Sequence, residues 1–314
     1  MLIVFLKILV IFLMVGIGFI SNKAHVLNGE SNKHLVNLML IITNPALILS
    51  SMSNRTPNPK LLNVSITVVI GSIVFFILVS AISFCIVKLL KYEPKEDAGI
   101  LMVAITAVNT GFMGFPITKA IFGDELMFLM VIENIVLNLY LFSLCIMQMN
   151  YGSKSKISLK YVIRSSINLC TIAAMLGILF FVTGLRLPAL IYDLLSSLGS
   201  ATIPISMIVV GIQLAESDVV RMAKNKKLLL ACVANEFLIP AITFASVYPL
   251  PIATSAKATL IFASCFPCAV VTVGIATKER RNSSLMAEAV ALTTFMSMIT
   301  LPVSAYLISL LLQV

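Results

Sequence analysis

Long apolar stretches separated by short polar segments recur along the whole chain of 314 residues. A helix needs about 20 mostly apolar residues to cross a hydrocarbon layer of about 30 Å. The first stretch, LIVFLKILVIFLMVGIGFI, already meets this requirement. The pattern predicts an all-α protein that crosses a membrane ten times. We expect the spans at residues 2–20, 35–52, 61–87, 98–122, 126–149, 162–184, 189–215, 228–248, 257–277 and 284–312.

The fourth and ninth predicted spans contain residues that a membrane helix usually avoids. Residues 108–118 read VNTGFMGFPIT, and residues 266–277 read FPCAVVTVGIAT. Proline lacks an amide donor and clashes with the carbonyl one turn before it, and glycine lets the backbone unwind. Because every backbone polar group in hydrocarbon needs a partner, we predict that both spans break partway across and that the broken ends face a cavity. The alternative is a proline kink beside a seam of small residues that packs helices together.

The two halves of the chain share features at a nearly constant separation. TNPALILSSM in the second predicted span and TIPISMIVVG in the seventh place Pro45 and Pro204 159 residues apart. Each half holds five spans, so the second half must be inverted in the membrane. Inverted repeats are typical of secondary transporters, whose sites lie near the midplane on discontinuous helices. We therefore predict a first five-helix repeat at 1–150, a cytoplasmic linker at 151–161 and an inverted repeat at 162–314.

The charged residues are few and unevenly placed. The chain is 60% hydrophobic and 11% charged, with a net charge of +9, whereas soluble domains are about 25% charged. The segments after the odd-numbered predicted spans hold 16 lysines and arginines, and those after the even-numbered spans hold 5. Cytoplasmic loops of membrane proteins carry such an excess. We therefore predict that both termini lie outside and that the lipid bilayer, not nucleic acid, explains the net positive charge.

Carboxyl and amide groups are expected inside the membrane. Glu133 and Glu236 each lie eight or nine residues inside a predicted span, which is about 12–13.5 Å at about 1.5 Å per residue. A carboxyl group in the membrane is costly and suggests a function. Because such a group favours its neutral form, either could carry a proton during transport; the alternative is a neutral side chain that joins helices. Asn134 and Asn138 continue a polar stripe with Glu133, and Asn44 is expected to make a packing hydrogen bond.

At these motifs the chain resembles the auxin efflux carrier family, which includes the plant PIN carriers and bacterial permeases for malate- and malonate-type acids. NTGFMGFP is similar to the fourth-span motif N-T-L-V-M-G-I-P of the plant carriers. The segment ISNKAHVLNGESNKHLVNLMLIITNPALILSSM is similar to the first hairpin of the family and its second-span proline. FPCAVVTV and ITLPVS are similar to its ninth-span and tenth-span motifs. The likeness extends over nearly the whole chain.

The resemblance implies ten helices in two inverted repeats, with the fourth and ninth crossing as broken helices. It also implies a homodimer in which spans one, two, six and seven form a scaffold and the rest move like an elevator. Asn109 matches the asparagine that contacts substrate in the family, while Thr272 stands where plant carriers have a second proline. The candidate substrate-binding residues are Asn109, Thr110, Gly111, Gly114, Pro116, Pro267, Val270 and Val271. The candidate coupling residues are Glu133, Asn134, Asn138 and Glu236.

These observations predict a permease, a secondary transporter of small organic anions such as carboxylates in the plasma membrane. The sequence contains no HExxH-type motif or Gly-rich phosphate loop, and its two histidines, His25 and His34, lie in the segment between the first two predicted spans. We therefore expect neither an enzyme nor a bound cofactor or metal. Two alternatives stay open: a sodium- or proton-coupled symporter of a related inverted-repeat fold, and a membrane sensor that binds its ligand without flux.

Overall fold

The computed structural model describes residues 2–53, 55, 57–151, 167–218 and 222–313. Over these residues the secondary structure is helical apart from one isolated β-bridge, which confirms the predicted all-α class. Six described helical stretches are long and apolar enough to cross a membrane: Gly29–Ser53, Pro59–Leu90, Thr110–Met149, Ala189–Glu216, Lys226–Val247 and Ser283–Leu312. Two further apolar stretches, Leu9–Lys23 and Leu169–Thr183, are shorter over the described residues.

The first half of the chain folds into helices that begin and end at recognisable signals. For example, the Asn58 side chain accepts a hydrogen bond from the Leu61 amide at 2.7 Å, and Pro59 occupies the first turn of the helix that follows. The helices are α1 (Leu2–Lys23), α2 (Gly29–Leu38), α3 (Asn44–Ser53), α4 (Pro59–Leu90), α5 (Ala98–Thr106), α6 (Phe115–Leu141) and α7 (Leu144–Met149). Short turns of other helix types are η1 (Met39–Thr43), η2 (Lys95–Asp97) and η3 (Thr110–Gly114).

The second half continues the same pattern. The predicted linker at 151–161 lies outside the described residues apart from residue 151, as does the start of the sixth predicted span. The described helices are α9 (Leu169–Thr183), α10 (Ala189–Ser200), α11 (Thr202–Glu216), α13 (Lys226–Val233), α14 (Ile239–Val247), α15 (Thr254–Ala263), α16 (Val271–Lys278) and α17 (Ser283–Leu312), with the π-helical turn η4 (Ala234–Leu238) between α13 and α14.

Helix α6 folds back on itself at Gly123. This residue has a φ of +81°, outside the helical range, and glycine adopts such a conformation without a steric penalty. The side-chain Nδ2 of Asn134 donates to the Thr110 hydroxyl at 3.0 Å, although the two residues are 24 positions apart in the chain. A straight helix would hold these residues about 36 Å apart at about 1.5 Å per residue. The two arms of α6 therefore run in opposite directions.

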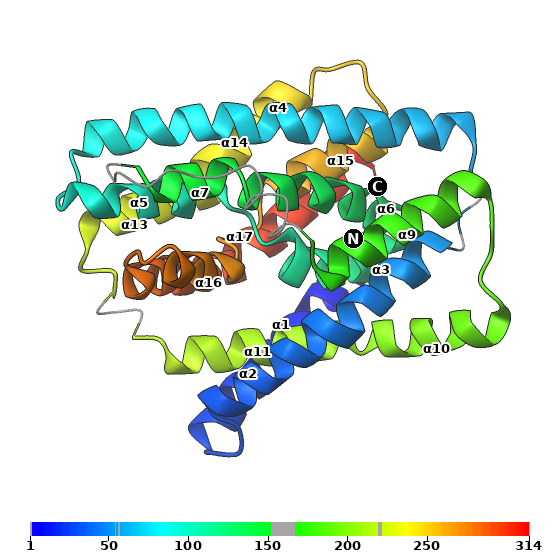
Figure 1. Cartoon of the computed structure of the whole chain (residues 1–314), viewed down its shortest axis with the longest axis horizontal. Helices are drawn as coiled ribbons and strands as arrows, with labels where there is room; N and C mark the ends of the chain where they lie inside the picture. The colour runs from blue at the N-terminus through cyan, green and yellow to red at the C-terminus, as the bar shows by residue number, and fades with distance from the viewer. Residues whose placement is uncertain (1, 54, 56, 152–166, 219–221, 314) are drawn as a thin grey trace.

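The helices pack into two groups that mix both halves of the chain. In one, α1 packs on α11, and α3 packs on α9 and α10; we call α1, α2, α3, α9, α10 and α11 the α1 group. In the other, α4 packs on α5, α6 and α15, and α13 packs on α5 and α17; we call α4 to α7 and α13 to α17 the α6 group. Figure 1 shows α4 along the upper side of the molecule and α10 and α11 end to end along the lower side, with α2 extending below α11.

Glycines bring α1 and α11 into direct backbone contact. A side chain at Gly18 would overlap the backbone of Ile208, and a side chain at Gly211 would overlap the Val15 carbonyl. Small residues at helix interfaces in membranes allow this close approach, which increases van der Waals packing. The crossing of α1 and α11 therefore depends on the absence of side chains at these two positions.

Candidate functional site

Two helical paths are interrupted, and the interruptions meet. One gap lies between α5 and η3, and the other lies between α15 and α16. The Asn109 amide donates to the Pro267 carbonyl at 2.9 Å, and the Ala269 amide donates to the Ala107 carbonyl at 2.8 Å. These bonds form an isolated antiparallel bridge. Each gap thus satisfies backbone groups of the other, as buried backbone requires, and both gaps fall within the spans that the sequence predicts to break.

The side chain of Asn109 caps the helical turn that follows the first gap. Its Oδ1 accepts a hydrogen bond from the Phe112 amide at 3.3 Å, which is how asparagine stabilises the start of a helix. The residue is buried, with 4% of its surface exposed. Its Nδ2 atom has no hydrogen-bond partner among the described residues. The amide therefore keeps donors for a ligand after it has served the backbone.

A cavity of about 260 Å³ lies beside the two gaps, where the α1 group meets the α6 group. We call it the crossover cavity. Among its described lining residues there is no lysine, arginine, aspartate or glutamate. Its apolar lining includes Phe112, Phe115, Leu137, Leu141 and Phe142. Its described polar side chains include five asparagines: Asn44, Asn109, Asn134, Asn138 and Asn168.

A chain of hydrogen bonds fixes two of these asparagines. The side-chain Nδ2 of Asn138 donates to Oδ1 of Asn134 at 2.9 Å, and the side-chain Nδ2 of Asn134 donates to the Thr110 hydroxyl at 3.0 Å. A side chain at Gly111 would lie 3.1 Å from the Asn134 amide nitrogen, so the glycine leaves room for this bond. The chain links the second arm of α6 to the first turn after the gap and orients polar atoms along one wall of the cavity.

The predicted substrate-binding residues separate into cavity-lining and supporting positions. Asn109, Gly111, Val270 and Val271 line the cavity. The other four lie behind them: Thr110 and Pro267 accept hydrogen bonds, Gly114 packs against Thr110 and Phe266, and Pro116 occupies the first turn of α6.

The two glutamates proposed for coupling lie outside the cavity lining. Glu133 is 1% exposed, and neither carboxyl oxygen has a partner at ordinary hydrogen-bond geometry among the described residues. Glu236, in η4, accepts a hydrogen bond from the Thr300 hydroxyl. The predicted polar stripe does not form on one face of the helix. Asn134 and Asn138, four residues apart, share a face and line the cavity, whereas the side chain of Glu133 diverges from that of the next residue, Asn134.

The α1 group contributes polar residues that sequence reasoning did not assign to the site. Asn44 was expected to make a packing hydrogen bond, yet it lines the cavity and its Oδ1 has no partner among the described residues. Asn168 lines the cavity while its Oδ1 accepts from the Thr171 amide at 3.0 Å, which caps α9. Both amides lie inside predicted spans, at 35–52 and 162–184, so the sequence held the same signal for Asn168 as for Asn44.

Comparison with known proteins gives matches over nearly the whole chain, including the features described above. The model of a family described as membrane transport protein matches residues 3–305. A curated protein of Methanocaldococcus jannaschii, named as an uncharacterized transporter, is 24% identical over 307 residues. The match covers 94% of this chain and 95% of that protein. Both interrupted helices and the crossover cavity lie within the matched region.

Proposed function

Because the chain belongs to the membrane transport protein family, we propose that it is a secondary transporter that moves small organic anions, carboxylates in particular, across the plasma membrane. The resemblance inferred from the sequence motifs is thereby confirmed at the level of the family. The observation that carries the proposal is the crossover cavity, where a buried asparagine with unused donors lies at the meeting point of two interrupted helices.

The ends of the interrupted helices suit an anion. Helix starts carry unpaired amide groups and a partial positive charge that attract carboxylates. The turn η3 begins beside Asn109, and α16 begins at Val271, which lines the cavity. With no cationic side chain among the described lining residues, the charge of the ligand would be shared among amide donors. We therefore propose that acids with one negative charge and a small apolar body bind better than dianions.

The volume of the cavity limits the size of the acid. Typical ligand pockets measure about 300–1,000 Å³, so a cavity of about 260 Å³ lies just below this range. The apolar lining suits the body of such a ligand, because the burial of apolar surface favours binding. We propose a small acid rather than a large indole-type auxin as the natural substrate.

We propose that the chain crosses the membrane ten times as two inverted repeats with both termini outside. Loops after odd-numbered predicted spans bond to one another, which supports one common side: Lys227 Nζ donates to the Lys91 carbonyl at 2.8 Å, and Arg281 Nη2 donates to Oδ1 of Asn150 at 3.0 Å. The reversal at Gly123 also divides one long helical stretch into two oppositely directed arms.

We further propose an elevator mechanism in which the α6 group slides along the α1 group, and a homodimer as the resemblance implies. The direct backbone contact of α1 with α11 supports a rigid α1 group. The bonds of Asn150 to Glu279 at 2.9 Å and of Asn282 to Asp97 at 2.9 Å support an α6 group that moves as one unit. A cavity bounded by both groups would open toward alternate sides as one slides past the other.

The environment of Glu133 supports coupling of transport to a proton. Its buried carboxyl group lacks a hydrogen-bond partner of ordinary geometry among the described residues, and an unpaired buried charge is costly. The neutral form is therefore favoured at this position, and a cycle that alternately hydrates and buries the group would bind and release a proton. Asn134, the next residue along α6, lines the cavity.

Ligand-induced stabilisation tests the proposed substrate class. The apparent melting temperature of the purified protein would be measured with a panel of mono- and dicarboxylates that includes pyruvate and malonate. A ligand that binds the folded state at 100 times its dissociation constant adds about 2.7 kcal/mol of stability. We expect stabilisation by small monocarboxylates that is weaker in Asn109→Ala. A panel in which no acid stabilises the parent protein would contradict the proposal.

A further inference from the structure

A cation lies on the first arm of α6, away from the helix crossing. Lys119 follows Asn109 by ten residues, about 15 Å along the first arm of α6 at about 1.5 Å per residue. The arm then reverses at Gly123, and the second arm returns to the crossing, where Asn134 meets Thr110. Of the α6 residues that line the crossover cavity, Leu137, Asn138 and Leu141 lie beyond this point, and Phe115 lies at the start of the first arm. Lys119 lies one turn farther along this arm than Phe115, away from the crossing.

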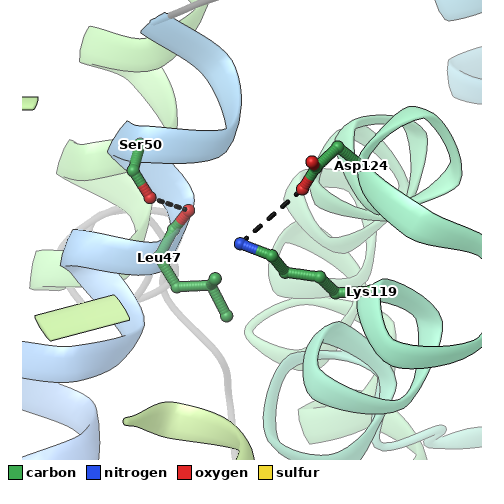
Figure 2. A network of polar contacts seen from close by, with 4 residues as sticks. All are labelled: Leu47, Ser50, Lys119 and Asp124. Carbon is green, nitrogen blue, oxygen red and sulfur yellow. Dashed lines mark hydrogen bonds and ion pairs between the residues drawn. The ribbon is translucent and has the colours of Figure 1, made fainter. Parts of the chain in front are cut away.

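The ammonium group of Lys119 lies at the boundary between the two helix groups. Figure 2 shows its side chain extending from α6 toward the backbone of α3 at Leu47, whose carbonyl accepts from the Ser50 hydroxyl at 3.1 Å. The same ammonium is 3.6 Å from Oδ1 of Asp124. Leu47 and Ser50 belong to the α1 group, whereas Lys119 and Asp124 belong to the α6 group. The cation thus points into the surface along which the groups meet.

The ion pair of Lys119 with Asp124 is weakly held. The Asp124 side chain is 64% exposed and the Lys119 side chain is 27% exposed. Exposed ion pairs contribute little to stability, because water screens the charges and two flexible side chains must be ordered. The ammonium can therefore exchange Asp124 for another carboxylate at little cost.

Another cation at this end of the molecule is placed differently. The guanidinium of Arg55 lies 5.9 Å from the centre of the Phe128 ring, so it is engaged with an aromatic face. Lys60 and Lys257 are directed elsewhere: Lys60 is exposed in the first turn of α4, and Lys257 donates to the Tyr248 carbonyl at 2.7 Å. Arg55, which follows α3, also lies against α6, but its charge is engaged with the Phe128 ring, whereas the described partner of Lys119 is the exposed Asp124.

We propose that Lys119 is a second anion-binding position, which contacts the carboxylate of the substrate between the crossover cavity and the opposite membrane face. A ligand can reach that face only where the α1 and α6 groups separate, and separation of α3 from α6 uncovers the ammonium. The crossover cavity itself has no basic side chain among its described lining residues. The carboxylate would therefore pass from the amide of Asn109 to the ammonium of Lys119. This inference rests on the proposed transport of small carboxylates.

Transport measured from each face separately tests the inference. Half-saturation concentrations of labelled pyruvate and malonate would be determined in proteoliposomes with a single protein orientation, for Lys119→Gln, Lys119→Arg and the control Lys60→Gln. Loss of a charged hydrogen bond that is partly exposed should raise the half-saturation concentration roughly 5- to 10-fold at the face that carries Lys119. We expect a smaller rise for Lys119→Arg, and no change at the other face or in the control.

The possible outcomes are distinguishable. An equal rise at both faces would show that Lys119 supports the fold or the cavity, and a rise of the same size in Lys60→Gln would show a general effect of surface charge; either overturns the inference. Unchanged values in Lys119→Gln, with an active parent, overturn it while leaving the transport proposal intact. If the parent exchanges neither acid, the proposed carboxylate transport is rejected, and this inference with it.

Discussion

A single side chain, Asn109, links the backbone of the crossing to the chemistry of the cavity. Its Oδ1 caps the turn after the first gap, and its Nδ2 lies buried without a partner among the described residues. A buried polar atom without a partner is costly in a membrane protein. A ligand oxygen that accepts from this nitrogen would remove that cost, so the residue favours the bound state of the protein.

Replacement of Asn109 by alanine should weaken ligand binding. The loss of one buried hydrogen bond costs about 1–3 kcal/mol, which corresponds to roughly a 5- to 150-fold loss of affinity. Calorimetry with pyruvate would measure it. Asn63→Ala, at an exposed position of α4, is the matched control and should bind like the parent. Parent-like affinity in Asn109→Ala would exclude the residue from the site.

Replacement of Glu133 by glutamine should uncouple transport from a pH gradient. The amide keeps the size and hydrogen-bonding capacity of the side chain but fixes it in a neutral state. Exchange of labelled pyruvate between equal concentrations should persist, while uphill accumulation driven by a pH gradient should disappear. Glu125→Gln, at an exposed position of the same helix, should accumulate like the parent. Accumulation by Glu133→Gln equal to that of the parent would leave Glu133 a structural role.

At the scale of elements, contacts between distant helices define what can move. The backbones of α1 and α11 touch at glycines, which joins the first and seventh predicted spans into one body. The hydrogen bonds between the two gaps likewise join α5 with α15 inside the α6 group. At the surface between the groups, where α3 faces α6, the ion pair of Lys119 with Asp124 lies within α6 and the hydrogen bond of Ser50 to Leu47 lies within α3, so neither crosses the surface. Sliding is therefore expected at this surface.

A methyl group at the crossing of α1 and α11 should destabilise the fold. In Gly18→Ala the added carbon would overlap the Ile208 backbone, and overpacking of a close contact costs about 1–3 kcal/mol. We expect a lower apparent melting temperature for this variant. Gly16→Ala, where an added carbon would meet nothing within 4 Å, should be neutral or slightly more stable, because alanine favours helix. Equal melting temperatures for the two variants would contradict the packing described for this crossing.

Sequence reasoning located the interrupted helices but not what they touch. Proline, glycine and asparagine in NTGFMGFP and FPCAVVTV mark where a helix is costly, and the gaps lie there. The bond from Asn109 to Pro267 joins residues 158 positions apart, and no local pattern encodes such a pairing. Asn168 was missed for the same reason: it reaches the cavity because α9 packs on α3.

At the scale of the whole molecule, the two ends differ in charge and in contacts. The segments at 91–97 and 57–60, which flank α4, lie at opposite ends of the molecule in Figure 1. The segment at 91–97 is hydrogen-bonded to a loop that also follows an odd-numbered predicted span: Lys227 donates to the carbonyl of Lys91. Hydropathy predicted apolar helices because the bilayer constrains each segment independently, and six described stretches are long enough to cross a membrane; the orientation drawn from charge stays a prediction. How the two helix groups pack could not be predicted in this way.

Cysteine labelling tests this orientation. In a variant without the six native cysteines, Lys95→Cys should resist an impermeant thiol reagent added to intact cells, while Lys60→Cys should react. Both positions are exposed, so accessibility depends on the side of the membrane. Disruption of the cells should make Lys95→Cys reactive. Labelling of Lys95→Cys in intact cells would contradict the proposed topology.

Counterflow across a membrane tests most directly whether the crossover cavity carries a small carboxylate. Liposomes that contain the protein would be loaded with unlabelled pyruvate and diluted into a trace of labelled pyruvate. We expect transient accumulation of label with the parent protein and strongly reduced accumulation with Asn109→Ala at the same trace concentration. A parent protein that pyruvate stabilises but that shows no counterflow would be a sensor, and counterflow unchanged in Asn109→Ala would place the transport path elsewhere.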